Sequence, residues 1–306
     1  MLTVSPYPPS PGWPRLPWLP AGYGPVVQAP TPLELRRGVL AVSVLHDVDV
    51  QPAEDGVLLT GRPDVWISWA ECRRALAGHE PETDGRRRLA HWLQARRWAA
   101  DLAPEQLRER IRPIGLPVDH VLHPGLDWVR DRVLGGALDL GLGAVDLDPA
   151  DPDRVVLLPT TALDAAGLQP EPLWIRARAL LEDLGQLAAQ RLRADPRGQL
   201  RPLGDCDVVT LLGSQRLRTA LAAAAGGMAA AVVPMRARGW TQLGLIDPAF
   251  GPAAAAATAE AERGFERPLL ITADELTIVP AGGRPEAIVL RDPSHDEPWL
   301  RDVLYR

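Results

Sequence analysis

Asp207-Val-Val-Thr-Leu-Leu-Gly-Ser214 begins the stretch that decides the fold, and the stretch runs on to Val233. The apolar run at 207–212 predicts a strand, and Ser214 predicts the N-cap of a helix over the Ala-rich segment that follows, residues 216–225. Two glycines then predict the end of that helix, and a second apolar run predicts a returning strand. The stretch therefore predicts one β-α-β unit.

The segments after this unit predict the rest of a C-terminal layer. The expected elements are strands at 241–246, 269–272, 276–279 and 287–290, and helices at 248–264 and 297–304. Over 205–273 the order is β-α-β-β-α-β, which is the order of a ferredoxin-like layer. We therefore expect an α/β protein of the α+β type with a ferredoxin-like region at 151–306.

The N-terminal half predicts a layer of β-hairpins and helices over 33–150. Short β-rich runs between Asp, Gly and Pro residues predict hairpins, and Ser68 followed by Glu71 has the spacing of a capping box. The expected strands are 39–45, 48–51, 57–60, 65–67, one within 138–147, and 155–158; the expected helices are 69–77, one from Asp84, 104–111, 126–134, and the longest from Pro172 to the turn at 195–198. The Gly- and Asp-rich piece 135–153 predicts a connection between domains.

Residues 1–32 form a Pro-rich segment with ten prolines, which disfavour helix and favour an extended arm. Four aromatic rings lie between these prolines: Tyr7, Trp13, Trp18 and Tyr23. One interpretation is a disordered tail. Such tails are usually poor in aromatic residues, so we favour an arm that docks on its own body or on a neighbouring subunit.

Composition excludes several classes of chemistry. The chain has 306 residues and a net charge of −6, and all 33 of its basic residues are arginine. A genome rich in GC explains the absence of lysine, and that absence excludes Schiff-base lysines, P-loop lysines and Ser-x-x-Lys sites. Cys72 and Cys206 are the only cysteines, so neither a disulfide framework nor a Cys-x-x-Cys site is expected. Without a signal-peptide pattern or a long apolar run, we expect a cytoplasmic protein.

One candidate site lies at the turn before the predicted helix, where Gly213 and Ser214 precede Arg216 and Arg218. Free amides at a helix N-terminus together with two arginines suit a phosphate or carboxylate group. The alternative is that Ser214 only caps the helix and that the arginines are solvated, and we favour it because the turn lacks the extra glycines of a nucleotide loop.

Other polar clusters suggest metal ligands more weakly. His120 and His123 are three residues apart but stand between prolines, and His46 lies beside two aspartates, so structural or exposed histidines are favoured over a metal site. The acidic run at 146–153 lacks the spacing of a calcium loop and predicts a solvated linker. We expect no metal and no cofactor.

Two adjacent blocks carry opposite charge. Residues 86–112 hold eight arginines and three acids, 8 − 3 = +5, and residues 113–160 hold three arginines and eight aspartates, 3 − 8 = −5. Such blocks invite contact within one molecule or between copies, although a solvated basic face is the simplest interpretation. Trp92 and Trp98 could stack on nucleic-acid bases, but their helical spacing favours a place in the core.

These observations favour a non-enzymatic protein-interaction or assembly module, which self-associates through the arm and the charge blocks as a homo-oligomer. The alternative is an enzyme or small-ligand-binding protein that acts on an anionic substrate at Gly213-Ser214. A nucleic-acid accessory protein is disfavoured by the net charge of −6. No group of reactive residues in the sequence indicates a catalytic residue, so whether the chain is an enzyme stays open.

Overall fold

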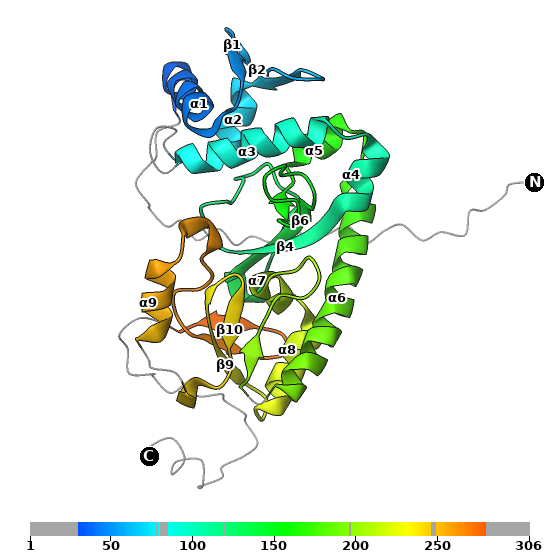
Figure 1. The fold of residues 1–306 in the computed structure, drawn as a ribbon, viewed down its shortest axis with the longest axis vertical. Coiled ribbons are helices and arrows are strands. Elements are labelled where there is room, and N and C mark those ends of the chain that lie inside the picture. Colours follow the sequence, from blue (N-terminus) through cyan, green and yellow to red (C-terminus); the bar gives the residue numbers. More distant parts are fainter. Residues whose placement is uncertain are drawn as a thin grey trace, which may run out of the picture.

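Three antiparallel sheets and the helices around them make up the described part of the chain (Figure 1). The computed structural model describes residues 30–77, 79, 85–118, 120–195, 197–245 and 249–279. The α+β class is therefore confirmed. Most of the arm, the strand expected at 287–290 and the helix expected at 297–304 lie outside the described residues.

Helix α1 (Pro32–His46) opens the described chain and replaces the strand expected at 39–45. The Thr31 side chain accepts from the Glu34 amide while the Glu34 carboxylate accepts from the Thr31 amide, so a capping box starts the helix upstream of the β-branched run. Leu35, Val39 and Val42 then share one buried face. The expected strand was wrong because burial of this face outweighs the β propensity of valine.

The first sheet has the order β1-β2-β3 and is covered by helices, as expected for the hairpins of this region. Its elements and the helices that follow are β1 (Val50–Pro52), β2 (Gly56–Leu59), β3 (Val65–Ser68), α2 (Trp69–Leu76), α3 (Gly85–Ala100) and α4 (Pro104–Arg110). The capping box at Ser68 and Glu71 is confirmed at the start of α2.

The second sheet corrects two expectations. It contains β4 (Ile111–Pro117), β5 (Arg130–Val133), β6 (Leu138–Ala144) and β7 (Val156–Leu157), and the short 3-10 turn η1 (Leu134–Gly136) joins β5 to β6. The helix expected at 126–134 is wrong, because β5 pairs with β6 there. Strand β6 confirms the strand expected within 138–147, but it is buried throughout, although it lies in the piece 135–153 that predicted a connection between domains. Gly141 is needed in this strand because a Cβ there would lie 2.5 Å from Trp128.

Helix α5 (Thr160–Ala165) precedes the longest described helix, α6 (Pro170–Ala194), which spans 25 residues. Leu173 and Ala177 of α6 pack in one buried cluster, and Leu181 and Ala189 pack in another. In Figure 1, α6 runs along one side of the molecule. The division into domains at residues 32 and 150 stays a prediction.

The third sheet has the order β12-β11-β9-β10-β8. Helix α8 (Gln215–Ala224) packs on its strands β9 and β11, whereas α7 (Val208–Leu212) packs on β4 of the second sheet and on α6 and α8. The run at 207–212 is therefore a helix and not the expected strand. The Asp207 carboxylate caps it by accepting from the Thr210 amide at 2.7 Å. Every residue of α7 is buried, so the run shows no apolar periodicity that separates helix from strand.

The ferredoxin-like order is not confirmed, because its expected first strand is helix α7 and the strand order of the third sheet is β12-β11-β9-β10-β8. The remaining elements are β8 (Gln199–Leu200), β9 (Ala229–Met235), β10 (Arg238–Trp240), η2 (Leu243–Leu245), α9 (Phe250–Ala257), η3 (Glu260–Glu262), β11 (Leu269–Ile271) and β12 (Leu276–Ile278). Strand β9 pairs with β10 and β11. The strand expected at 241–246 is wrong, because β10 covers 238–240 and the turn η2 covers 243–245. The helix expected to reach residue 264 ends at 257.

Candidate functional site

The structure brings Gly213, Ser214, Arg216 and Arg218 together at the start of α8, where a carboxylate from α6 already occupies the helix N-terminus. Glu182 accepts from the Gln215 amide at 2.9 Å and from the Arg216 amide at 3.0 Å, and Ser214 Oγ donates to it at 2.9 Å. Ser214 also caps α8 by accepting from the Leu217 amide. This turn therefore binds an anion, and the anion is a side chain of the same molecule.

The two arginines of this turn also have partners inside the chain. Arg218 is buried and donates through Nη1 to the carbonyl oxygens of Leu212 and Gly213, both at 2.8 Å. Arg216 pairs with Asp183 at 3.0 Å on the surface. Arg218 thus caps the C-terminal end of α7. An external anion at this turn would compete with Glu182.

Close approach of two helices places Glu182 at this turn. Gly185 lies one turn further along α6, and a Cβ on it would overlap the Ser214 side chain. Burial alone would raise the pKa of Glu182, but hydrogen bonds from the Arg216 and Gln215 amides and from Ser214 lower it overall. Sequence reasoning missed Glu182 because it lies far upstream in another helix.

We expect Glu182→Ala to lower the free energy of unfolding by about 1 to 3 kcal/mol, because it leaves two helix amides and a buried hydroxyl without their acceptor. Added phosphate should recover part of this loss in the variant and stabilise the wild type less. Urea unfolding with and without phosphate measures both effects. Asp183→Ala is the matched control, since its ion pair with Arg216 is exposed and should contribute about 0 to 1 kcal/mol. Equal stability of Glu182→Ala and the control would contradict the prediction.

His123 lies in a buried charge cluster around Asp139 of β6. Asp139 is fully buried, and its carboxylate accepts from Arg132 Nε at 3.0 Å and lies 2.8 Å from Arg130 Nη1. His123 Nδ1 accepts from the Gly125 amide, so Nε2 carries the proton and donates to Asp139 at 3.2 Å. Burial opposes the ionisation of Asp139, yet hydrogen bonds from His123 and Arg132 hold its pKa well below the usual range.

His120 joins two loops instead of holding a metal with His123. Its Nδ1 accepts from the Leu122 amide and its Nε2 lies 3.2 Å from the Arg263 carbonyl oxygen. Burial and the charge of Arg236 lower the pKa of His120 to about 3, so the ring is neutral near pH 7. Among the described residues, no three His, Cys, Asp or Glu side chains gather to hold a metal ion.

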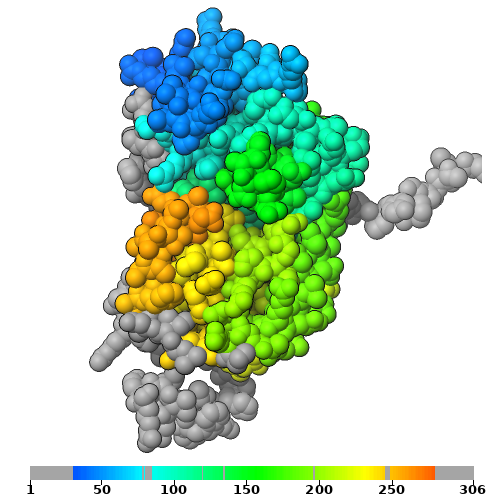
Figure 2. Space-filling model, viewed as in Figure 1, coloured from blue at the N-terminus to red at the C-terminus, as the bar shows by residue number. Residues whose placement is uncertain are grey.

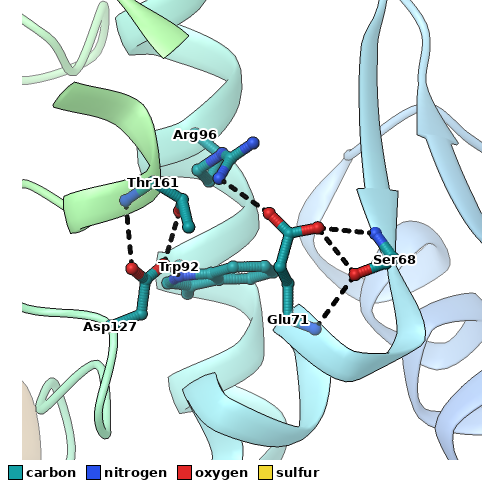
Figure 3. Close-up of polar contacts among 6 residues, drawn as sticks. All are labelled: Ser68, Glu71, Trp92, Arg96, Asp127 and Thr161. Carbon is teal, nitrogen blue, oxygen red and sulfur yellow. Dashed lines mark hydrogen bonds and ion pairs between the residues drawn. The ribbon is translucent and has the colours of Figure 1, made fainter. Parts of the chain in front are cut away.

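A second polar network joins α2 and α3 to the loop before β5 and to α5 (Figure 3). Trp92 is buried and donates through Nε1 to Asp127 at 2.8 Å, and Asp127 also accepts from the Thr161 amide at 3.0 Å. On the other side of Trp92, Arg96 pairs with Glu71 at 3.3 Å. Trp92 is therefore a core residue, as its spacing predicts, and not an exposed stacking platform.

The charge blocks meet within one molecule at Arg110 and Asp146, whose ion pair measures 2.8 Å. Asp148 of the acidic run is buried, and its carboxylate accepts from the Ala150 amide in a turn and pairs with Arg154. This ordered turn packs beside β6, where sequence reasoning expected a solvated linker.

The two cysteines are inert packing residues. Burial raises the pKa of Cys72 and of Cys206 to about 12, so neither thiol ionises near pH 7. No helix in the described ranges is long and apolar enough to cross a membrane.

No family model, curated protein or solved structure matches this chain. Its function must therefore be argued from its own surface.

The most unusual described surface is the outer face of α1. Leu33, Leu40 and Val44 are 57%, 42% and 83% exposed, although all three are large apolar residues. The helix lies at the end of the molecule, in the blue region of Figure 2. The predicted arm leads directly into this helix at Thr31, whereas its four rings lie outside the described residues.

Proposed function

We propose that the chain is a self-associating assembly module and that α1 carries its self-interface. The observation that supports this most directly is the exposed apolar stripe of α1, which consists of Leu33, Leu40 and Val44. These residues are separated by seven and four positions, so they lie on one side of the helix. The opposite side holds the buried Leu35, Val39 and Val42, so the helix is apolar on two faces. A helix apolar on two faces is suited to packing between two bodies.

The charges around α1 favour a second copy as the occupant of the stripe. An antiparallel pair of α1 helices that sets Leu40 opposite Val44 of the other copy also sets Arg37 opposite its Asp47, since 40 + 44 = 37 + 47 = 84. Arg37 and Asp47 are both exposed. A twofold pair repeats each of these contacts, so apolar and opposite-charge contacts fall into the same register.

The arm would add buried surface area to the interface, because a pair of α1 helices alone buries too little. A stable interface buries about 1,200 to 2,000 Å² in total, more than two short helices bury. Large aromatic side chains bury about 150 to 250 Å² each, so the four rings of each arm could bring the contact to that size. The charge blocks contribute less to this proposal than the arm does, because Arg110 and Asp146 pair within one molecule.

Sedimentation velocity and native mass spectrometry of the full chain test the proposal. We expect the wild type to be dimeric and Leu40→Asp with Val44→Asp to weaken association roughly 100-fold or more, because two carboxylates would be buried in each copy. Deletion of residues 1–29 should weaken association to a lesser extent.

Ile175→Asp is the matched control, because Ile175 is an apolar residue on α6 that is exposed to a degree similar to the α1 residues. It should leave the dimer intact. A monomeric wild type, or equal association of the α1 variant and the wild type, would overturn the proposal.

A further inference from the structure

An open cavity of about 570 Å³ lies where the C-terminal end of α6 meets β8 and α7. Its floor is apolar and is formed by leucine and valine side chains at the edge of the largest buried cluster, among them Leu192, Leu200, Leu203, Val208 and Leu211. This volume lies within the range of about 300 to 1,000 Å³ that is usual for small-ligand sites. The floor residues come from α6, β8, the loop after β8 and α7.

The rim of the cavity is basic. Arg191, Arg197 and Arg201 line it and are exposed, and among the described residues none of the three forms an ion pair with an acid. Within the described ranges, Arg201 donates to the side-chain oxygen of Gln199, at 3.1 Å from Nε and 2.6 Å from Nη2.

Asp195 is the only acidic residue of the lining, and its carboxylate accepts from the Arg197 amide within the turn. Three arginines against one aspartate leave a formal charge of 3 − 1 = +2. The carbonyl end of α6 subtracts about half a charge, so the rim stays positive.

The other two large openings hold acids beside their arginines. In the cleft of about 930 Å³ between α3 and the loop after η3, Arg87 pairs with Glu260, and Glu266 lies in the same lining. In the groove of about 810 Å³ between α6 and α8, Glu182 is part of the lining, and Arg216 there pairs with Asp183. The cavity at β8 therefore combines an apolar floor with arginines that have no acidic partner.

We propose that this cavity binds an amphiphilic anion, a small molecule with a hydrocarbon body and a carboxylate head. The leucine and valine floor would cover the body, and each buried methylene strengthens binding about fourfold. The planar guanidinium groups at the rim match a carboxylate in bidentate geometry. A peptide fits less well, because β8 has only two residues and offers almost no edge for backbone pairing. This site is separate from the α1 stripe and does not depend on self-association.

Isothermal titration of the full chain with dodecanoate tests the proposal. We expect one site per chain. Dodecanol, which has the chain without the charge, and acetate, which has the charge without the chain, should each bind at least about tenfold more weakly. Far-UV circular dichroism at the end of each titration confirms that the protein stays folded.

Two variants test the contributions of the carboxylate head and of the hydrocarbon body to dodecanoate binding separately. Arg197→Gln with Arg201→Gln should weaken dodecanoate about tenfold without changing the melting temperature. Ala188→Leu narrows the cavity from α6 and should weaken dodecanoate while the response to acetate stays the same. Arg193→Gln is the matched control on the same helix, since Arg193 faces the groove with α8, and it should bind dodecanoate as the wild type does.

Equal affinity for dodecanol and dodecanoate, unchanged affinity in the double arginine variant, or no binding below the micelle concentration would each overturn the proposal. Arginine-dependent binding of an acidic, apolar peptide without binding of dodecanoate would also overturn it and would assign the cavity to a protein partner.

Discussion

Asp139→Asn should lower the free energy of unfolding by about 1 to 3 kcal/mol, among the largest effects that we expect from a single substitution in the described chain. The carboxylate is fully buried and holds His123, Arg130 and Arg132 together. An asparagine has nearly the same shape, but it is neutral and offers one acceptor oxygen instead of two, so the three donors that meet at this buried position lose an acceptor. Urea unfolding at pH 7 measures the loss.

Asp131→Asn is the matched control for this experiment. Asp131 lies on β5 and pairs with Arg178, but both side chains are about half exposed, so the change should cost about 0 to 1 kcal/mol. A loss below about 1 kcal/mol for Asp139→Asn would mean that solvent at Arg130 and Arg132 replaces the lost acceptor and that the cluster does not hold β5 to β6.

Acidification should destabilise the protein from about pH 6.5 downward, because the folded chain keeps two histidines neutral, the buried His120 and the partly buried His91. Burial lowers the pKa of His120 to about 3 and that of His91 to about 4. An unfolded chain protonates these rings near pH 6.5, while the folded chain resists protonation until pH 4 or 3. The stability they contribute is therefore fully present above the unfolded pKa and is lost as the pH falls toward the folded pKa. Each ring should remove about 1.4 kcal/mol per pH unit within that window.

Chemical denaturation at a series of pH values measures this slope. His120→Gln should lower the free energy of unfolding at pH 7, because it removes the contact with the Arg263 carbonyl. It should also make the free energy of unfolding depend less steeply on pH between pH 4 and 6, by about 1.4 kcal/mol per pH unit, the contribution of one histidine. Between pH 7 and 8 the wild type and the variant should differ by a constant amount. An identical slope in both proteins below pH 6 would assign the acid sensitivity to other groups. Asp139 has a lowered pKa, so the stability it contributes is lost only at still lower pH.

Local signals predicted two of the helices that begin at a side-chain cap, although the caps at Thr31 and Asp207 were missed. Ser68 with Glu71 located the start of α2, and Ser214 located the start of α8, because each hydroxyl accepts a bond within three residues. The long helix α6 was also predicted, since its apolar residues recur over many turns.

Elements that depend on distant partners were missed. The run 207–212 is buried on every side, so its residues carry no periodicity, and only the cap at Asp207 marks a helix. Segment 130–133 forms a strand because β6 lies beside it. Sequence alone located the four residues of the candidate turn, but not Glu182, whose position depends on the packing of α6 against α8 through Gly185.

Helix α6 contributes residues to two buried clusters, so its rotation about its axis must suit both. Leu173 and Ala177 pack in one cluster, Leu181 and Ala189 pack in the other, and no break in the helix separates them. One residue inserted between Ala177 and Leu181 would rotate the second half of the helix by about 100° relative to the first. Glu182 would then turn away from α8 while the first core stayed in place. Adding about a whole turn would restore the rotation but would shift the second half by about 5.4 Å along the axis. The length of this helix is therefore constrained by both cores together.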